Sequence, residues 1–408
     1  MAAPPTPTPT PPPPESPPPA PTTILTIGDD LLLEIFLRLP SLPALVRAAF
    51  ACRTFLNTIR SSPTFRPTFH ALHPPPLIGL FLTHRDGAIP SFAPLRGRAD
   101  KDHAAVLRGS DFFLTRVPDD QGCWTIRDCR DGYLLLHNDR DGLLAAYSPL
   151  ARALRRIPSP PTEPLRELYI LSNNPEDGSF RLVCVHEDGL RVRAVVFSSD
   201  SGEWQVLPWT DGATINKDHP NDDEHCLPPA PTTGKLLPNG RIYWARSDYL
   251  IVLNTTTLQF SSMDLPPPMD GQKPFVVGET KDEELCMVCA IDHRLTVAIW
   301  VRKRADDGDD VEKWMLDREV TLPEIPVFKL AAASRGFLYL HLMARNDPNI
   351  VPLCSVFSFC LEEIPAAEPK KIFSLYQYEL ERSYPYVMPW PSSLACSNKI
   401  MNPPIATT

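Results

Sequence analysis

The sequence predicts an α+β protein in which a small N-terminal unit of three helices precedes an all-β propeller. Apolar residues recur with helical spacing near the front of the chain, and prolines then interrupt it. Beyond the prolines, short apolar runs repeat in units of roughly 45 to 55 residues, as propeller blades do. We therefore expect a disordered Pro/Thr-rich tail over residues 1–23, the helical unit over 24–72, a Pro-rich linker over 73–76 and the propeller over 77–408.

Composition indicates a globular protein and excludes several classes of partner. Hydrophobic residues make up 43% of the 408 residues and charged residues 22%, which leaves enough apolar surface for a large core. A net charge of -9 argues against a nucleic-acid surface, and no apolar stretch reaches the roughly 18 residues that cross a bilayer. The first residues lack the pattern of a secretory signal, and the ten cysteines are scattered singly. These features predict a cytoplasmic and/or nuclear protein with reduced thiols and no membrane partner.

The tail at residues 1–23 consists mainly of Pro, Thr and Ala with Glu15 as its single charge. Such a segment lacks the apolar side chains that would offset the entropy of ordering, so it is expected to be disordered. A transit peptide is the competing interpretation, but transit peptides are rich in Arg, which is absent here.

The first predicted helix is apolar on almost every side. Asp29 and Asp30 suit its first turn. One face carries four apolar residues with the helical spacing i, i+3, i+4 and i+7, namely Leu32, Ile35, Phe36 and Leu39. The opposite face adds Leu31, Leu33 and Leu37. A helix that is apolar nearly all round must be covered on more than one side.

Two further helices are expected before the prolines. Ser41 can cap the second helix with Pro43 in its first turn. Helical spacing then continues through Leu45, Ala49, Cys52, Leu56 and Ile59. The third helix would start at Ser62 and Pro63 and carry Phe65 and Phe69, although Pro67 interrupts it.

Everything beyond residue 76 has the pattern of β-strands. Predicted strands include residues 132–136, 143–147, 180–185, 192–197 and 242–245. They belong to five successive units, each with a strand after a Gly turn, an apolar middle strand and an outer strand that ends in Pro. Residues 77–82, 112–117 and 386–390 could close the ring as a sixth blade, and seven blades remain possible. A β-sandwich is the rival architecture.

The helical segment resembles an F-box. The resemblance lies in Ile27-Gly28-Asp29-Asp30-Leu31-Leu32-Leu33-Glu34-Ile35-Phe36-Leu37-Arg38-Leu39-Pro40 and in Ala51-Cys52-Arg53-Thr54-Phe55. Gly28 stands where the family usually has Pro, and Phe55 where it has Trp. With the repeats that follow, the chain is similar to plant F-box proteins that carry a C-terminal F-box-associated, kelch-like β-propeller.

That resemblance implies a non-catalytic substrate-recognition subunit of an SCF-type (Skp-cullin-F-box) ubiquitin ligase. The helices would bind a Skp-family adaptor, and through it the cullin and the RING protein, while the propeller would bind an unknown protein substrate. The implied adaptor-binding positions are Ile27, Asp30, Leu31, Leu32, Ile35, Phe36, Leu39, Pro40, Cys52 and Phe55. A segment of about 45 residues buries little of its own surface, so its surplus of apolar residues favours a partner, although packing on the propeller is the alternative.

A search for enzymatic motifs identifies no catalytic residue, so we expect no catalytic activity, metal or cofactor. Cys286 and Cys289 form a Cys-x-x-Cys within an apolar strand, where they would point to opposite faces as structural thiols. The loop with His219, His225 and Cys226 has side chains that could bind zinc, but the ordinary polarity of a loop explains these residues equally well. The acidic run Asp306, Asp307, Asp309 and Asp310 lacks calcium-loop spacing.

Substrate-binding residues are not identifiable from the sequence, although Trp209, at the entrance to a long loop, is the aromatic residue to examine. The alternative function is a propeller that binds or processes a small molecule or glycan, with helices that only resemble an F-box.

Overall fold

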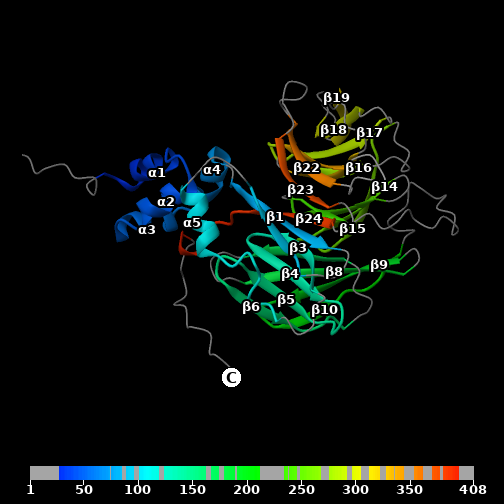
Figure 1. The fold of residues 1–408 in the computed structure, drawn as a ribbon, viewed down its shortest axis with the longest axis horizontal. Coiled ribbons are helices and arrows are strands. Elements are labelled where there is room, and N and C mark those ends of the chain that lie inside the picture. Colours follow the sequence, from blue (N-terminus) through cyan, green and yellow to red (C-terminus); the bar gives the residue numbers. More distant parts are fainter. Residues whose placement is uncertain are drawn as a thin grey trace, which may run out of the picture. The chain divides into compact units, whose positions relative to one another are not determined.

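A computed structural model of the chain divides into two compact units, residues 1–74 and 75–408 (Figure 1). The residues that it describes are 27–73, 75–84, 89–95, 101–118, 124–161, 167–173, 179–188, 191–211, 234–237, 239–245, 249–267, 275–291, 296–304, 312–321, 328–334, 336–343, 353–361, 370–376 and 380–394. The predicted tail, the loop with His219 and the acidic run at 306–310 lie outside these residues. Within the described part, no helix is long and apolar enough to cross a membrane.

The described part of the first unit contains four helices, so the prediction of three is wrong. They are α1 (Asp29–Leu37), α2 (Leu42–Ala49), α3 (Arg53–Ser61) and α4 (Phe65–Leu72). Ser41 caps α2 as expected, because its hydroxyl accepts a hydrogen bond from the amide of Ala44 at 3.4 Å. The core of the unit consists of Leu32, Phe36, Leu42, Leu45, Ala49, Ile59, Phe65 and Phe69.

The long second helix of the prediction is divided in two at Cys52. The backbone of Cys52 is extended, with φ -154° and ψ 158°, and its Sγ accepts a hydrogen bond from the amide of Phe55 at 3.5 Å. Cys52 therefore caps a new helix instead of continuing the old one. Pro67 lies only in the third position of α4, where a missing amide hydrogen costs no intrahelical bond. The final helix thus forms despite the proline.

The second unit is a six-bladed β-propeller, as its strand pairing shows. Blade 1 has strands β3 (Trp124–Arg130), β4 (Tyr133–Asn138), β5 (Leu144–Ser148) and β6 (Ala153–Ile157). Blade 2 has β7 (Glu167–Asn173), β8 (Phe180–Asp188), β9 (Arg191–Ser198), β10 (Glu203–Val206) and the short β11 (Thr210–Asp211). Blade 3 has β12 (Lys235–Leu236), β13 (Arg241–Ala245), β14 (Tyr249–Asn254) and β15 (Phe260–Asp264). Blade 4 has β16 (Phe275–Glu279), β17 (Leu285–Ala290), β18 (Thr296–Arg304) and β19 (Glu312–Thr321). Blade 5 has β20 (Phe328–Ser334), β21 (Phe337–Met343), β22 (Leu353–Cys360) and β23 (Lys370–Tyr376).

Blade 6 joins segments from the two ends of the unit. Its strands are β24 (Leu380–Val387), β1 (Leu77–His84) and β2 (Ser91–Pro94), paired antiparallel in that order (Figure 1). Closure of the ring by terminal segments was expected, but two of the pieces differ from the prediction. Residues 112–117 form turns instead of a strand, because the Asp111 carboxylate accepts hydrogen bonds from the amide and hydroxyl of Thr115. The closing strand also ends at Val387, before Trp390.

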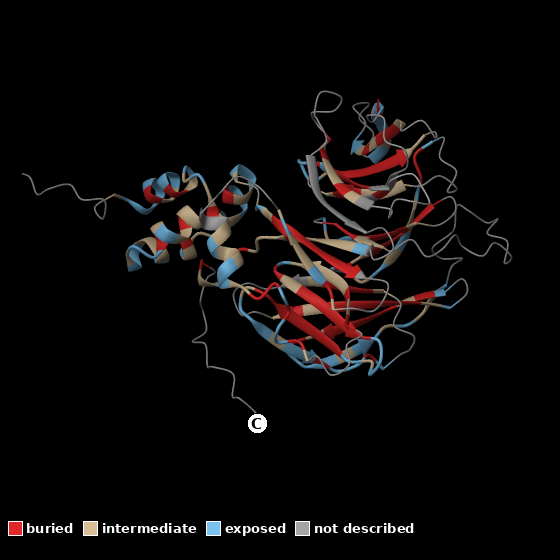
Figure 2. Cartoon of the chain, viewed as in Figure 1, coloured by how far each residue is buried: buried red, intermediate tan, exposed pale blue. Residues whose placement is uncertain are grey.

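Burial follows the position of each strand within its blade (Figure 2). The middle strands β5, β14 and β17 are buried along nearly their whole length, whereas the outer strands β6, β10 and β19 are mostly exposed. A strand buried on both faces needs a continuous apolar run, which is how these middle strands read in the sequence. The strands predicted from 132–136, 143–147, 180–185, 192–197 and 242–245 are all present.

The inner strands were largely missed by sequence reasoning. The first strands of neighbouring blades contact one another, as β24 does with β3, β3 with β7, and β16 with β20, so they form the inner ring. Strand β3 carries Asp128 and Arg130, and β7 begins with Glu167, so neither has the apolar pattern of an ordinary strand. The unit also contains a helix, α5 (Lys101–Gly109), between β2 and β3, so the expectation of an all-β unit is wrong.

Several tryptophans join neighbouring blades. The indole N–H of Trp204 on β10 donates to the carbonyl of Pro158, just after the outer strand of blade 1, at 2.7 Å. Trp314 on β19 makes the equivalent bond to the carbonyl of Asp264 on blade 3, at 2.8 Å. These residues therefore hold the outer edges of adjacent blades together.

Candidate functional sites

Helix α1 has two apolar faces with different surroundings. Leu32 and Phe36 are 1% and 3% exposed, and the Phe36 ring packs edge-on against Phe55 with ring centroids 5.3 Å apart. Leu31 and Ile35 lie one residue before each of them and are 58% and 40% exposed. One face therefore builds the core of the helical unit, while the other offers aliphatic side chains to solvent.

The ten predicted adaptor-binding positions separate into three groups. Exposed positions are Asp30, Leu31, Ile35 and Pro40. Half-buried positions are Ile27, Leu39, Cys52 and Phe55. Leu32 and Phe36 are buried inside their own unit, so their role is to support the fold.

Sequence reasoning missed two exposed side chains of the helical unit. Phe50, the residue that follows α2, is 56% exposed, and Leu72, the last residue of α4, is 58% exposed. No signal in the sequence pointed to Phe50, because the apolar helical spacing continues across Cys52 and hides the end of α2.

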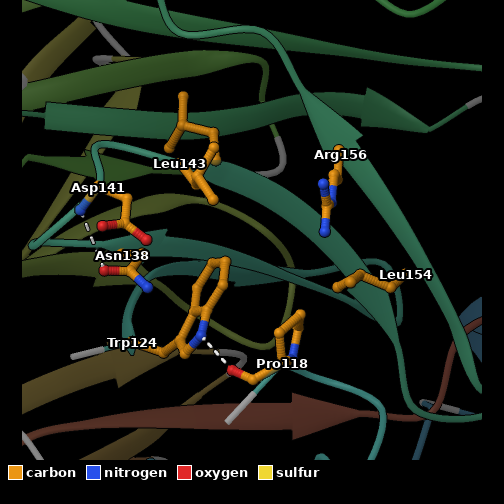
Figure 3. A pocket seen from close by; sticks show the side chains of 8 residues that line it. Pro118, Trp124, Asn138, Asp141, Leu143, Leu154 and Arg156 are labelled. Atoms are coloured by element: carbon orange, nitrogen blue, oxygen red, sulfur yellow. Dashed lines mark hydrogen bonds between the residues drawn. The ribbon is translucent and has the colours of Figure 1, made fainter. Parts of the chain in front are cut away.

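The propeller presents a pocket on blade 1 (Figure 3). We call it the blade 1 pocket; its volume is about 60 Å³, and its lining residues are Pro118, Trp124, Asn138, Asp141, Leu143, Leu144, Leu154 and Arg156. The indole N–H of Trp124 donates to the carbonyl of Pro118 at 2.9 Å, which fixes the ring in the pocket floor. The pocket lies at the end of the blade where strands β4 and β5 are joined.

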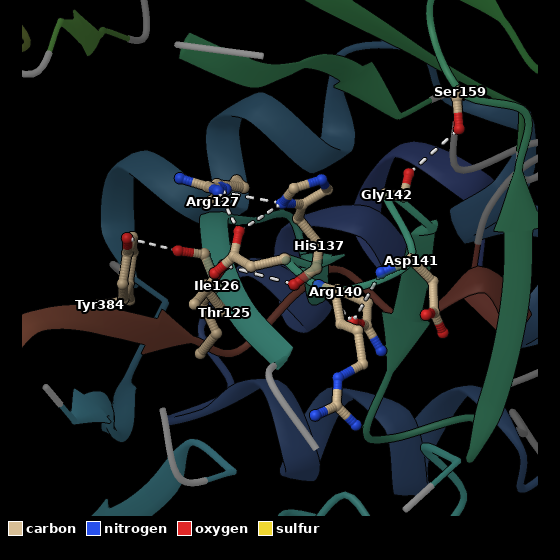
Figure 4. Close-up of polar contacts among 11 residues, drawn as sticks. Thr125, Ile126, Arg127, His137, Arg140, Asp141, Gly142, Ser159 and Tyr384 are labelled. Atoms are coloured by element: carbon tan, nitrogen blue, oxygen red, sulfur yellow. Dashed lines mark hydrogen bonds and ion pairs between the residues drawn. The ribbon is translucent and has the colours of Figure 1, made fainter. Parts of the chain in front are cut away.

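An ion network lies on the same blade (Figure 4). A β-bulge leaves Arg127 without a partner in the pairing of β3 with β4, and such bulges redirect side chains. Its guanidinium lies 2.7 Å from Asp139 Oδ1 and 2.9 Å from His137 Nδ1, and His137 Nδ1 lies 2.8 Å from the same Asp139 oxygen. Burial, reinforced by the Arg127 charge, lowers the pKa of His137 below its ordinary 6.5. The imidazole is therefore neutral at neutral pH.

We expect His137 to make folding stability depend on pH. Between its lowered native pKa and 6.5, the unfolded chain binds more protons than the native chain, so stability rises with pH across this window. The contribution is complete above 6.5 and is lost as the pH falls through the native pKa. Each unit of pKa depression corresponds to about 1.4 kcal/mol. Thermal melts of wild type and His137→Asn between pH 4.5 and 7.5 should show a shallower pH dependence in the variant; parallel curves would contradict this prediction.

Trp209 lies just before β11 and is half-buried. The Arg193 guanidinium lies 4.3 Å from its ring centroid and that of Arg191 lies 5.3 Å away, both from strand β9. Arg191 also forms an ion pair with Asp188 at 2.5 Å. The ring of Trp209 is thus engaged by two cations of its own blade. Whether it also contacts a substrate stays a prediction.

Charged side chains on the inner strands interact electrostatically and also bond to the backbone. The two Asp128 oxygens accept hydrogen bonds from the amides of Cys129 and Ile170, each at 2.8 Å, and burial raises the pKa of the Asp128 carboxyl. Burial lowers the pKa of Lys235, while the Glu279 and Asp128 charges favour its charged form. The charges of Arg130 and Lys235 in turn favour the ionised form of the Asp128 carboxyl.

The Cys-x-x-Cys pair lies in the core, as predicted. Cys286 and Cys289 on β17 are 0% and 3% exposed, and burial, with the nearby Glu279 charge, raises the pKa of Cys286 to about 12. Both are free thiols, and Cys286 packs in the apolar cluster between blades 4 and 5. Among the described residues, no group of three or more His, Cys, Asp or Glu side chains could hold a metal ion.

The fold and these features define a propeller protein with a separate helical unit. A family model described as "F-box protein AT5G49610-like, beta-propeller" matches residues 125–335, which is more than half of the chain. The chain therefore belongs to this family of β-propeller proteins. No curated protein matches the sequence.

Solved structures share only weak likeness with the chain. A chain of a nidogen/laminin complex has a TM-score of 0.39 at 12% identity, with 75% of this chain and 96% of that chain covered. A protein from Lactobacillus plantarum has a TM-score of 0.39 at 13% identity, covering 72% and 81%. The WD40 domain of SCAP from fission yeast has a TM-score of 0.32 at 10% identity, covering 66% and 74%.

Proposed function

We propose that the protein is a substrate receptor of an SCF-type ubiquitin ligase, whose helical unit is an F-box that binds a Skp-family adaptor. The observation that carries the proposal is the exposed aliphatic face of α1. Leu31 and Ile35 remain in solvent although Leu32 and Phe36 fill the core behind them. Membership of an F-box-protein propeller family supports the same function.

The physical argument rests on the small size of the helical unit. A unit of about 45 residues buries a smaller fraction of its surface than a larger domain, so apolar residues left outside its core are costly unless a partner covers them. An amphipathic helix that inserts its apolar face into a groove is a recurring mode of protein recognition. Leu31 and Ile35, one helical turn apart, have the spacing that this mode uses.

The chain itself performs no bond chemistry in this proposal. The helical unit binds the ligase while the propeller holds a substrate protein. This joint binding raises the effective concentration of the substrate's lysines near the activated ubiquitin. Catalysis belongs to the other ligase subunits, so the contribution of this chain is choice of substrate and proximity.

The test is adaptor binding by a surface variant of α1. Leu31→Asp combined with Ile35→Asp places two charges on the proposed contact, and we expect affinity for a purified Skp-family adaptor to fall at least 100-fold. Affinity is measured by calorimetry on the full chain. The matched control is Met315→Asp, because Met315 on β19 is 50% exposed but belongs to the propeller. Unchanged affinity in the double variant would contradict the proposal.

A further inference from the structure

The blade 1 pocket combines an apolar floor with two charged groups on its rim. Trp124 and Leu144 are only 4% and 1% exposed, and Leu154 is half-buried, so the floor is mostly apolar, with buried Asn138 as its polar member. Leu143 on the rim is 38% exposed, which leaves an aliphatic side chain at the entrance. Asp141 and Arg156 lie on opposite sides of the pocket (Figure 3).

These two rim charges make no polar contact within the part of the chain that the structure describes. The Asp141 carboxylate and the Arg156 guanidinium form no hydrogen bond or ion pair with any residue that the structure describes. Two other cations of the same blade are engaged, since Arg127 pairs with Asp139 and Arg155 donates to the carbonyl of Ser199. An acid and a base at opposite sides of an apolar floor are therefore available to an outside ligand.

The loop that presents the acidic side of the rim is held in shape. Asn138 Oδ1 accepts hydrogen bonds from the backbone amides of Arg140 and Asp141 at 2.9 and 3.3 Å. The backbone N–H of Asn138 donates to the carbonyl of Leu143 at 2.9 Å. Gly142 turns the chain with φ +67°, and its carbonyl accepts a bond from the hydroxyl of Ser159 at 3.0 Å (Figure 4). A rim fixed before binding loses little entropy when a ligand arrives.

We propose that the blade 1 pocket binds a linear peptide segment of the substrate protein, in which an aliphatic side chain lies between a basic and an acidic residue. The aliphatic side chain enters the pocket, the basic residue pairs with Asp141, and the acidic residue pairs with Arg156. This assignment rests on the proposed function, because it names the chemistry of the substrate that the receptor recognises.

The size of the pocket selects the aliphatic residue. The pocket volume of about 60 Å³ is well under half of the roughly 150 Å³ of a cavity that holds a benzene ring. A Val or Leu side chain fills such a space, whereas an aromatic ring does not. The polar groups of the floor are already engaged, because the Trp124 N–H donates to the carbonyl of Pro118 and Asn138 Oδ1 accepts from the amides of Arg140 and Asp141.

The test exchanges the two charges. Full-length protein is applied to an array of synthetic peptides of the pattern basic-Leu-acidic and acidic-Leu-basic, with spacers of zero to three residues and with Leu replaced by Ser or Phe. We expect wild type to prefer one charge order, with binding about five- to tenfold weaker for Ser or Phe at the centre. Asp141→Arg or Arg156→Glu alone should weaken the preferred peptides about five- to tenfold. The double exchange Asp141→Arg with Arg156→Glu should bind the opposite charge order.

Inversion of the preferred order supports the proposal, because a fold defect cannot reverse a preference. The proposal is overturned if no peptide of either order binds better than its Ser-centred form, or if the double exchange leaves the preference unchanged. Asp200→Lys is the matched control, since Asp200 is an exposed acid in a turn of blade 2 and should leave the profile as in wild type. Adaptor affinity measured on the same samples separates failure of this site from failure of the ligase assignment.

Discussion

A chain that ends at Tyr376 should fail to form a stable propeller. The truncation removes β24 and thereby strips β1 of its longer partner, leaving only the pair β1 and β2 in blade 6. It also removes Tyr386, which is 0% exposed and packs against Phe81 and Phe112 with ring centroids 5.7 and 5.2 Å apart. A two-stranded remnant is at best marginally stable, so we expect loss of the cooperative thermal transition and of near-UV circular dichroism.

The matched control for this truncation ends at Leu394. It retains every residue that the structure describes, including β24 and the following turn, so it should melt as the full chain does. Dye binding to exposed apolar surface should rise in the chain ending at Tyr376 and remain low in the control. A cooperative transition at the wild-type temperature in the shorter chain would show that the ring does not depend on terminal closure.

Phe36→Ala should unfold the helical unit, whereas Ile35→Ala should leave it folded. Phe36 is 3% exposed and contacts Phe55, so its truncation leaves a cavity and costs about 3–5 kcal/mol. A unit of about 45 residues has little more stability than that. Ile35 is 40% exposed, and surface truncations usually change stability by less than about 0.5 kcal/mol.

Hydrogen exchange measured by mass spectrometry can distinguish these two variants within the full chain. Amides of α1 to α4 should lose protection in Phe36→Ala and keep it in Ile35→Ala, while peptides from the propeller remain unchanged in both. Equal protection in the two variants would mean that the buried and exposed faces of α1 are assigned wrongly. The comparison also matters for tests of adaptor binding, because a charged substitution of Phe36 would abolish that binding by unfolding the helical unit.

The sequence predicted a helical unit followed by a propeller. It did not show which face of helix α1 is buried. An amphipathic helix reveals its buried side by periodicity, but α1 is apolar nearly all round, so the pairs Leu31/Ile35 and Leu32/Phe36 have the same spacing. Only packing against α3 and α4 decides which pair is buried. The capping role of Cys52 was likewise hidden, because Cys is a rare cap and the apolar spacing continued across it.

In the propeller, the sequence predicted the apolar middle strands and the outer strands that end in Pro, but it missed the inner strands. Strands β5 and β14 are apolar along nearly all of their length and were identified, while β3 and β7 contain charged residues and were missed. The blade 1 pocket had no sequence signal at all. Its lining combines Trp124 with Leu154 and Arg156 from another strand of the same sheet, so it exists only once the blade is assembled.

Because blade 6 needs strands from both ends of the unit, the propeller can finish folding in the cell only after β24 has been translated. Strand β1 leaves the ribosome early, but β24 follows only after nearly the whole propeller has been translated, on the order of tens of seconds later at ordinary elongation rates. During that interval the apolar residues of β1, including Leu80 and Phe81, are not yet paired with β24. The nascent chain is therefore expected to engage chaperones until release, and mutations that slow translation late in the message would prolong this exposure.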